Sequence, residues 1–351
     1  MTDKSDIRIE ADRLRAIFEA RGAEVFETDI LQPAGALLDL YGENIRARAF
    51  VTHDPLQGEM MLRPDFTLPL VQRHMTEERG EGRYTYAGEV FRRQEDNPDR
   101  ASEYMQVGYE LFSAAAGPEA DAEVFATFYE VLGSLGLRAA IGDLGLLRAA
   151  VEGLVENPFR KAALLHHLWR PRRFRTLLNR FSETEHRPLP TMNDSVEIGL
   201  RSRTEVELRL AAMEADQNEP PIDISAVNLI DAVLAVREKA PDALSQLRYL
   251  AVDLPAITPA VEALTTRFDA MASRGVDVDT LDFEASYGRT SLEYYDGFVF
   301  GFYAESRADL PPVATGGCYN ALTRAIGGGD GVPAVGGVIR PGLVLELGRA
   351  P

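Results

Sequence analysis

The chain has 351 residues and a formal charge of −18, and its composition is 45% hydrophobic and 26% charged. This balance is typical of a globular protein, and no apolar run approaches the ~20 residues of a membrane-spanning helix, so no membrane association is expected. The negative charge argues against nucleic-acid binding over the whole surface, because that binding depends on clustered lysine and arginine.

The cysteines and histidines argue against metal chemistry. Cys318 is the only cysteine, which excludes an internal disulfide and any multi-cysteine metal site. The five histidines show no metal-ligand spacing, and the chain contains no Walker-type phosphate loop, HExxH or GxSxG motif. The N-terminal segment also lacks the basic and then apolar order of a signal peptide. We therefore expect a cytoplasmic protein without a metal or another cofactor.

The first 145 residues are expected to combine helices with antiparallel strands. Pro33 marks the junction between a β-rich run and a helical pattern, and Gly22 and Gly136 are expected to end helices. Hydrophobic spacing predicts helices over about residues 6–21, 65–75 and 124–135. Alternating residues predict strands over 46–52, 59–62, 83–92 and 103–113, of which the last two form a long hairpin.

The pattern changes between residues 146 and 255, where short helical stretches are broken by eight prolines. We interpret 146–255 as a separate, mostly helical insertion between two parts of one core, 1–145 and 256–351. A helix over 258–273 and a set of aromatic strands resume this core. Strands grouped in this way favour an α+β fold, an antiparallel sheet flanked by helices, over a doubly wound parallel sheet.

One segment, Arg160 to Arg187, carries a net positive charge in an otherwise acidic chain. It contains eight cationic residues against Glu183 and Glu185. A solvated helical face is one interpretation of this segment, and a binding surface for an acidic partner is the other.

Two short motifs place polar groups where a strand ends or faces a pocket. Asp65 and Thr67 lie where a strand gives way to a helix, so the carboxylate is either a ligand group or a helix cap. Gln106, Gly108 and Glu110 share one face of a predicted strand, and such a face suits the floor of a pocket better than a core.

Arginines end one strand of the hairpin. Arg92 and Arg93 present two guanidiniums, which suit the capture of a phosphate or a carboxylate but are also common at exposed strand ends. The polar loop that follows adds Arg100.

The aromatic run LEYYDGFVF contains Tyr294 and Tyr295. Its alternation predicts a strand, although Asp296 and Gly297 could instead form a hairpin turn. Edge-strand aromatics beside a solvated Glu293 are the simpler interpretation of the same residues.

Taken in order, these segments resemble histidyl-tRNA synthetase, a class II aminoacyl-tRNA synthetase. GRYTYAGEVFRRQE and EYMQVGYELF, residues 82–95 and 103–112, are similar to the second class II motif, and Pro33 lies in a segment like the first, which builds the dimer interface. LEYYDGFVF, residues 292–300, resembles the histidine-binding LDYY segment, and GGCYNAL, residues 316–322, resembles its partner GGRYDGL. The resemblance implies a class II synthetase-like sheet and covers the chain apart from the insertion.

The resemblance also implies a histidine-binding site. Asp65 and Thr67 would meet the amino group of histidine, with Gln106 beside the substrate. The imidazole would be surrounded by Glu110, Tyr294 and Tyr295. A neutral imidazole has one donor and one acceptor, so a carboxylate and a phenol can satisfy both nitrogens.

Several positions depart from the synthetase pattern. Thr290 stands where the family has its catalytic arginine, Gln94 replaces a motif glutamate, and Cys318 and Asn320 replace the arginine and aspartate of GGRYDGL. The third motif is shortened around Arg340. Because activation of an amino acid by ATP needs cations aimed at the α-phosphate, no synthetase chemistry is expected.

A retained amino-acid pocket, an altered ATP site and no anticodon-binding domain resemble the regulatory subunits of short-form ATP phosphoribosyltransferase. This family implies a non-catalytic chain that forms homodimers, assembles with the short catalytic subunit into a hetero-octamer, and activates it. It also implies feedback inhibition by histidine in the first step of histidine biosynthesis. Arg92 and Arg100 remain candidates for binding an anion without catalysis. A truncated histidyl-tRNA synthetase, a related ATP-dependent ligase and an interaction scaffold with a vestigial pocket are the alternatives.

Overall fold

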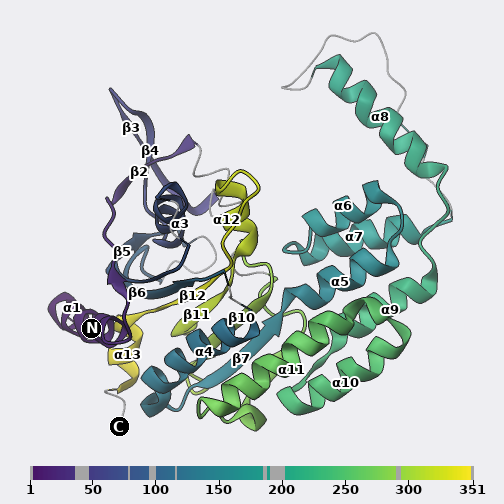
Figure 1. Ribbon diagram of the computed structural model, residues 1–351. Helices are drawn as coiled ribbons and strands as arrows, with labels where there is room; N and C mark the ends of the chain where they lie inside the picture. The colour runs from purple at the N-terminus through teal and green to yellow at the C-terminus, as the bar shows by residue number, and fades with distance from the viewer. Residues whose placement is uncertain are drawn as a thin grey trace.

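The computed structural model describes residues 3–35, 47–77, 80–94, 100–114, 117–184, 188–189, 202–289 and 294–348. These residues form a nine-stranded mixed sheet with a three-stranded sheet above it (Figure 1). The strands of the large sheet are, in spatial order, β1 (Glu24–Val25), β5 (Gly82–Phe91), β6 (Glu103–Phe112), β12 (Ala334–Ile339), β11 (Ala314–Cys318), β10 (Phe298–Tyr303), β7 (Arg138–Asp143), β9 (Asp282–Glu284) and β8 (Arg237–Lys239). Those of the small sheet are β2 (Leu31–Pro33), β4 (Gly58–Leu62) and β3 (Phe50–Asp54).

Some helices cover the two faces of the large sheet, and others form a helical region beside it (Figure 1). They are α1 (Lys4–Glu19), α3 (Thr67–Thr76), α4 (Pro118–Leu132), α5 (Leu144–Leu154), α6 (Pro158–His166), α7 (Pro171–Ser182), α8 (Arg203–Gln217), α9 (Ile224–Ala235), α10 (Ala240–Asp253), α11 (Thr258–Ser273), α12 (Asn320–Ile326) and α13 (Pro341–Gly348). Buried residues of α1, α4 and α11 belong to one hydrophobic cluster, and those of α3 and α12 belong to a second. None of the described helices is long and apolar enough to cross a bilayer.

Strand β6 lies between these two clusters. Its side chains alternate, so Val107, Tyr109 and Leu111 pack into the cluster that contains α1 and α4. The opposite face carries Gln106 and Glu110, each only 1% exposed. This alternation places two buried polar side chains beneath α3.

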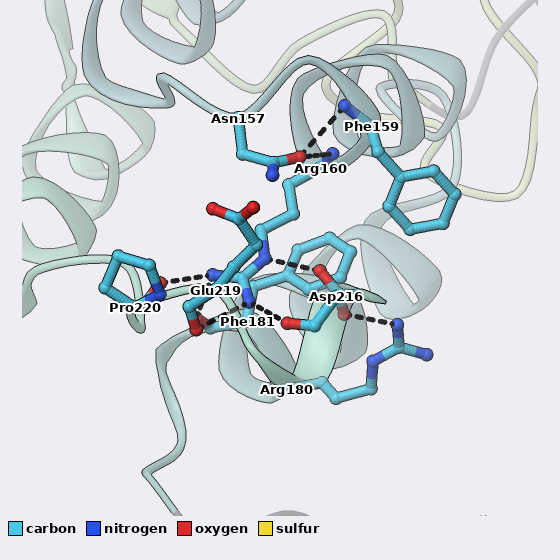
Figure 2. A network of polar contacts seen from close by, with 8 residues as sticks. All are labelled: Asn157, Phe159, Arg160, Arg180, Phe181, Asp216, Glu219 and Pro220. Carbon is cyan, nitrogen blue, oxygen red and sulfur yellow. Dashed lines mark hydrogen bonds and ion pairs between the residues drawn. The ribbon is translucent and has the colours of Figure 1, made fainter. Parts of the chain in front are cut away.

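Helix α8 projects from the helical region that α5 to α10 form, and most of its residues are exposed (Figure 1). Its last turn is fixed by Asp216, whose Oδ1 accepts a 2.5 Å hydrogen bond from Nε of the buried Arg160 (Figure 2). Arg180 donates to the second carboxylate oxygen at 3.2 Å, and Arg160 also donates to the carbonyl of Pro220 at 2.7 Å. Burial of a charge is tolerated when it is paired and hydrogen-bonded, and Arg160 meets both conditions.

The expected α+β fold is confirmed, and so is the hairpin of β5 and β6. The sheet is mixed and not wholly antiparallel, because β1 pairs with β5 and β7 pairs with β9 in parallel. The helices expected over 6–21, 65–75, 124–135 and 258–273 are observed as α1, α3, α4 and α11. Strand β7 was not predicted from the sequence, because its residues Arg138–Asp143, RAAIGD, do not alternate between apolar and polar.

The strand expected over residues 292–300 is partly wrong. Strand β10 begins only at Phe298, so the two tyrosines precede it. The hairpin-turn alternative is also wrong, because β11 and β7 occupy the two edges of β10, whereas a hairpin at Asp296 and Gly297 would need a partner strand directly before it. The Asp296 carboxylate instead accepts hydrogen bonds from the backbone N–H groups of Asn320 and Ala321 at 3.0 and 2.8 Å. Asp296 therefore caps the start of α12.

Some expectations fall on residues outside the described ranges. They include most of the helical pattern after Pro33 and the positions Thr290 and Glu293. The division into 1–145, 146–255 and 256–351 stays a prediction.

Candidate functional site

Glu110 lies at the centre of a group of buried hydroxyls. Its Oε1 accepts hydrogen bonds from the Thr67 hydroxyl and the Tyr86 phenol, both at 2.9 Å. Its Oε2 accepts a hydrogen bond from the Tyr319 phenol at 2.7 Å. A carboxylate offers about four acceptor positions, so the hydrogen bonds of the described residues leave one position on Oε2 for the N–H group of a ligand.

Burial raises the pKa of Glu110 from its ordinary value of 4.5 to about 7, against the three hydroxyl donors, which act to lower it. Burial, and then the charge of Glu110, also raises the pKa of the Tyr319 phenol well above its usual range. The same two causes raise the pKa of Tyr86. Both phenols therefore keep their protons at neutral pH and act as donors to the carboxylate.

Two glycines make room for this arrangement. Gly336 of β12 pairs with Glu110, and a Cβ atom at Gly336 would lie 1.5 Å from Oε2 of that carboxylate. Gly108 pairs with Tyr86, and a Cβ atom there would lie 2.0 Å from Cζ of the phenol ring. The side chains of Glu110 and Tyr86 thus each extend over a glycine of the neighbouring strand, and the Cβ atom of any other residue there would collide with them.

Tyr294 and Tyr295 join the same buried cluster. They are 6% and 5% exposed, and their ring centroids lie 5.0 Å apart. The alternation of a strand would have placed them on opposite faces, but this part of the chain is irregular. Burial raises the pKa of both phenols, and the charges of Asp65 and Glu110 raise it further. These two tyrosines therefore lie within electrostatic reach of both carboxyl groups and remain protonated.

Asp65 and Gln106 are the other buried polar residues expected in the site. Oδ1 of Asp65 accepts a 3.4 Å hydrogen bond from the Leu68 N–H in the first turn of α3, so a weak form of the capping role is observed. Oδ2 lies 3.9 Å from Nη2 of Arg92. Oε1 of Gln106 has no hydrogen-bond partner among the described residues. Because an unpaired buried acceptor costs about 1–3 kcal/mol, an ammonium or N–H donor of a ligand would stabilise it.

Arg92 is not an exposed strand-end arginine, since it is 7% exposed and its Nε donates to the carbonyl of Pro64 at 2.7 Å. The guanidinium of Arg340 lies over the Tyr104 ring, 5.4 Å from the centroid. Burial lowers the pKa of Arg340, and the charges of Arg92 and Arg100 lower it further, against the effect of Tyr104. Three cationic side chains therefore converge here, and such a group attracts anions.

Among the described residues of the basic segment, several arginines form ion pairs inside the chain. These are Arg160 and Arg180 with Asp216, and Arg175 with Asp231. On α7, Arg172 and Arg173 are exposed, while Arg187 lies outside the described residues.

The sequence analysis assigned Thr67 and Glu110 to one site, and their side chains are hydrogen-bonded to each other in the structure, but it did not assign Tyr86 or Tyr319 to that site. Both were open to prediction in part. Tyr86 lies opposite Gly108 in the expected hairpin, and Tyr319 lies inside the GGCYNAL segment. Neither signal shows that the two phenols meet the same carboxylate.

Two of the cavities in the structure lie elsewhere. One of about 580 Å³ is bordered by α10 and α11, and one of about 190 Å³ lies between the start of α6 and α8. Neither is lined by any of the predicted site residues. The candidate site is recognised by its buried polar groups.

A family model described as Histidyl-tRNA synthetase matches residues 4–189 and 198–341. An ATP phosphoribosyltransferase regulatory subunit of Rhizobium leguminosarum bv. trifolii is 29% identical over 93% of this chain and 94% of its own length. A protein of the same name from Brucella canis is 29% identical over 92% of this chain and 93% of its own length. The expected resemblance to this group of regulatory subunits is confirmed, and the names favour a non-catalytic chain over a synthetase.

Solved structures share the fold. A crystal structure from Bacillus halodurans C, described as an ATP phosphoribosyltransferase regulatory subunit/histidyl-tRNA synthetase, has a TM-score of 0.71 at 20% identity and covers 99% of this chain and 81% of that chain. A histidyl-tRNA synthetase from a Nostoc species has a TM-score of 0.65 at 17% identity and covers 100% of this chain and 74% of that chain. At these identities the likeness establishes the class II synthetase-like architecture.

Proposed function

We propose that this chain, which belongs to the histidyl-tRNA synthetase family, is a regulatory subunit of short-form ATP phosphoribosyltransferase that senses histidine. In this role it does no chemistry itself. It activates the catalytic subunit, and bound histidine reverses the activation. The names of the curated relatives support the regulatory role, and the buried hydroxyls around Glu110 support the histidine sensor.

The single observation that carries the histidine site is the acceptor position on Oε2 of Glu110 that the described residues leave without a donor. An imidazole N–H donates to this position, while the protonated phenol of Tyr294 or Tyr295 donates to the other ring nitrogen. The amino group of histidine binds near Asp65 and Thr67, and it satisfies the unpaired oxygen of Gln106.

The altered synthetase positions support binding without catalysis. Cys318, which stands where the synthetases have an arginine, is buried, and its thiol donates to Asp121 at 3.1 Å. Burial raises the pKa of this thiol well above its usual range. Cys318 is therefore a neutral group and offers no charge to a reacting phosphate.

The converging arginines form a second proposed site, for an anion. Arg92, Arg100 and Arg340 bind a phosphate-bearing ligand beside Tyr104, and the loss of the other synthetase cations leaves this binding without a reaction. Direct titration with inorganic phosphate and with ATP tests this site. Arg100→Ala is expected to weaken binding, and equal affinity of the variant would remove Arg100 from the proposal.

The proposed assembly is a homodimer of this chain that joins the short catalytic subunit in a hetero-octamer. The exposed Arg172 and Arg173 on α7 are candidates for contact with an acidic surface of that partner. Sedimentation of the chain alone and mixed with the catalytic subunit tests the stoichiometry. A monomer that stays separate from the catalytic subunit would contradict it.

Calorimetric titration with L-histidine tests the binding site. The wild-type chain is expected to bind with a 1:1 stoichiometry, and Glu110→Gln is expected to bind about 10-fold more weakly or worse, because a hydrogen bond to a charged group is lost. Glu123→Gln is the matched control, since Glu123 lies on α4 and pairs with Arg83 outside the site. Absence of heat with the wild-type chain would overturn the proposal.

A further inference from the structure

Trp169 is the only tryptophan of the chain, and it lies in the turn between α6 and α7. Its indole Nε1 donates a 2.7 Å hydrogen bond to the backbone carbonyl of Tyr295. The indole packs against both hydrophobic clusters, the one that contains α6 and α7 and the one that contains the candidate site. Trp169 thus connects the helical region directly to the backbone of a site residue.

A second contact joins the same turn to the chain that precedes the site. Nε of Arg289 donates to the carbonyl of Leu168 at 2.8 Å, and its guanidinium lies 4.9 Å from the ring centroid of Phe174 on α7. Arg289 is only 6% exposed. Two consecutive residues of the turn therefore bond to the chain around the site. Leu168 accepts a hydrogen bond from Arg289, and Trp169 donates one to Tyr295.

The other end of the tyrosine pair is held by the sheet. The backbone N–H of Asp296 donates to the carbonyl of Cys318 at 3.0 Å, and the Asp296 carboxylate caps α12. The backbone at Tyr294 and Tyr295 belongs to no strand or helix. Asp296 and the indole of Trp169 therefore both hold this stretch of backbone in place.

We infer that Trp169 is a positioning residue of the candidate histidine site, and that it couples the occupancy of this site to the turn between α6 and α7. This inference rests on the proposed function, because it assumes that histidine binds beside Tyr294 and Tyr295. A ligand that shifts the tyrosine backbone moves the carbonyl to which the indole donates. The change reaches α7, whose exposed face carries Arg172 and Arg173.

Tryptophan fluorescence of the wild-type chain during a histidine titration tests the coupling without any substitution. The indole emission is expected to change and to saturate with the dissociation constant that calorimetry gives. A control reporter is the double variant Trp169→Phe with Tyr249→Trp, since Tyr249 is 74% exposed on α10. Its emission is expected to stay constant in the same titration.

Calorimetry of Trp169→Phe tests the positioning role. The phenyl ring keeps the apolar contacts but leaves the Tyr295 carbonyl without its donor, so the dissociation constant for histidine is expected to rise about 3- to 10-fold. Asn179→Ala, an exposed change on α7, is expected to bind histidine as the wild type does.

The outcomes separate this inference from the proposed function. If the wild-type chain binds histidine but its fluorescence does not change, or if Trp169→Phe binds equally well, the inference is overturned and the histidine site stands. If calorimetry shows no histidine binding by the wild-type chain, the proposed function fails first. If Trp169→Phe does not fold, the fluorescence of the wild-type chain decides.

Discussion

The phenol of Tyr319 donates a hydrogen bond to Oε2 of Glu110 at 2.7 Å, although 209 residues separate them in the chain. The contact joins the start of α12 to the C-terminal part of β6. It also sets the proposed binding geometry, because it occupies one of the two acceptor positions of that oxygen.

Tyr319→Phe is expected to weaken histidine binding about 2- to 10-fold, as the loss of one hydrogen bond predicts. Without this donor the charged form of Glu110 is less stable, so a smaller fraction of the chain presents a carboxylate to the imidazole. Calorimetry measures the change. Tyr249→Phe is the control, since Tyr249 is 74% exposed on α10 and belongs to neither hydrophobic cluster. Unchanged binding by Tyr319→Phe would show that this phenol does not support the site.

The stability of the protein is expected to depend on pH through Glu110. Its pKa in the folded chain, about 7, exceeds the ordinary value of 4.5. The folded state therefore holds a proton that the unfolded state has released between these values. The free energy of unfolding is expected to fall as pH rises through this window, by at most about 1.4 kcal/mol per pH unit, and to level off above it.

Denaturant unfolding isolates this contribution when the wild type and Glu110→Gln are compared between about pH 5 and about pH 8, the window in which Glu110 titrates. The variant has no titrating carboxyl at this position, so the difference between the two curves carries the signal. Parallel curves would show that Glu110 has an ordinary pKa.

Arg267→Met is expected to destabilise the fold by about 3–5 kcal/mol, because it leaves two buried carboxylates without their cation. Arg267, 4% exposed on α11, donates to Asp121 at 2.8 Å and to Asp143 at 2.9 Å. Chemical denaturation measures the loss. Arg274→Met, at the residue that follows α11, removes an exposed pair with Glu119 and a hydrogen bond to the Ala270 carbonyl, and it is expected to change the stability little. A loss below about 1 kcal/mol for Arg267→Met would contradict the ion-pair account.

The elements that depend on local spacing could be predicted from the sequence. The hairpin of β5 and β6, with Gln106 and Glu110 on one face, follows from alternation along about ten residues. Helix α11 was predicted at its observed bounds, since its apolar spacing is regular and Gly275 follows it.

The contacts that assemble the site could not be predicted in the same way. The interactions of Glu110 with Tyr319 and of Trp169 with Tyr295 join segments separated by 209 and 126 residues. Tyr294 and Tyr295 share one cluster because the chain leaves strand geometry before β10, while alternation predicted opposite faces. Resemblance to a known family supplied the six site residues. The three-dimensional arrangement added the phenols of Tyr86 and Tyr319 and the indole of Trp169.

Reconstitution of the enzyme tests the central claim most directly. The activity of the short ATP phosphoribosyltransferase catalytic subunit is measured with and without this chain, at zero and at saturating histidine, and with Glu110→Gln in place of the wild type. The account predicts that the chain raises the rate, that histidine lowers it again, and that the Glu110→Gln chain still activates but responds weakly to histidine. A catalytic subunit whose rate is unaffected by this chain, with or without histidine, would contradict it.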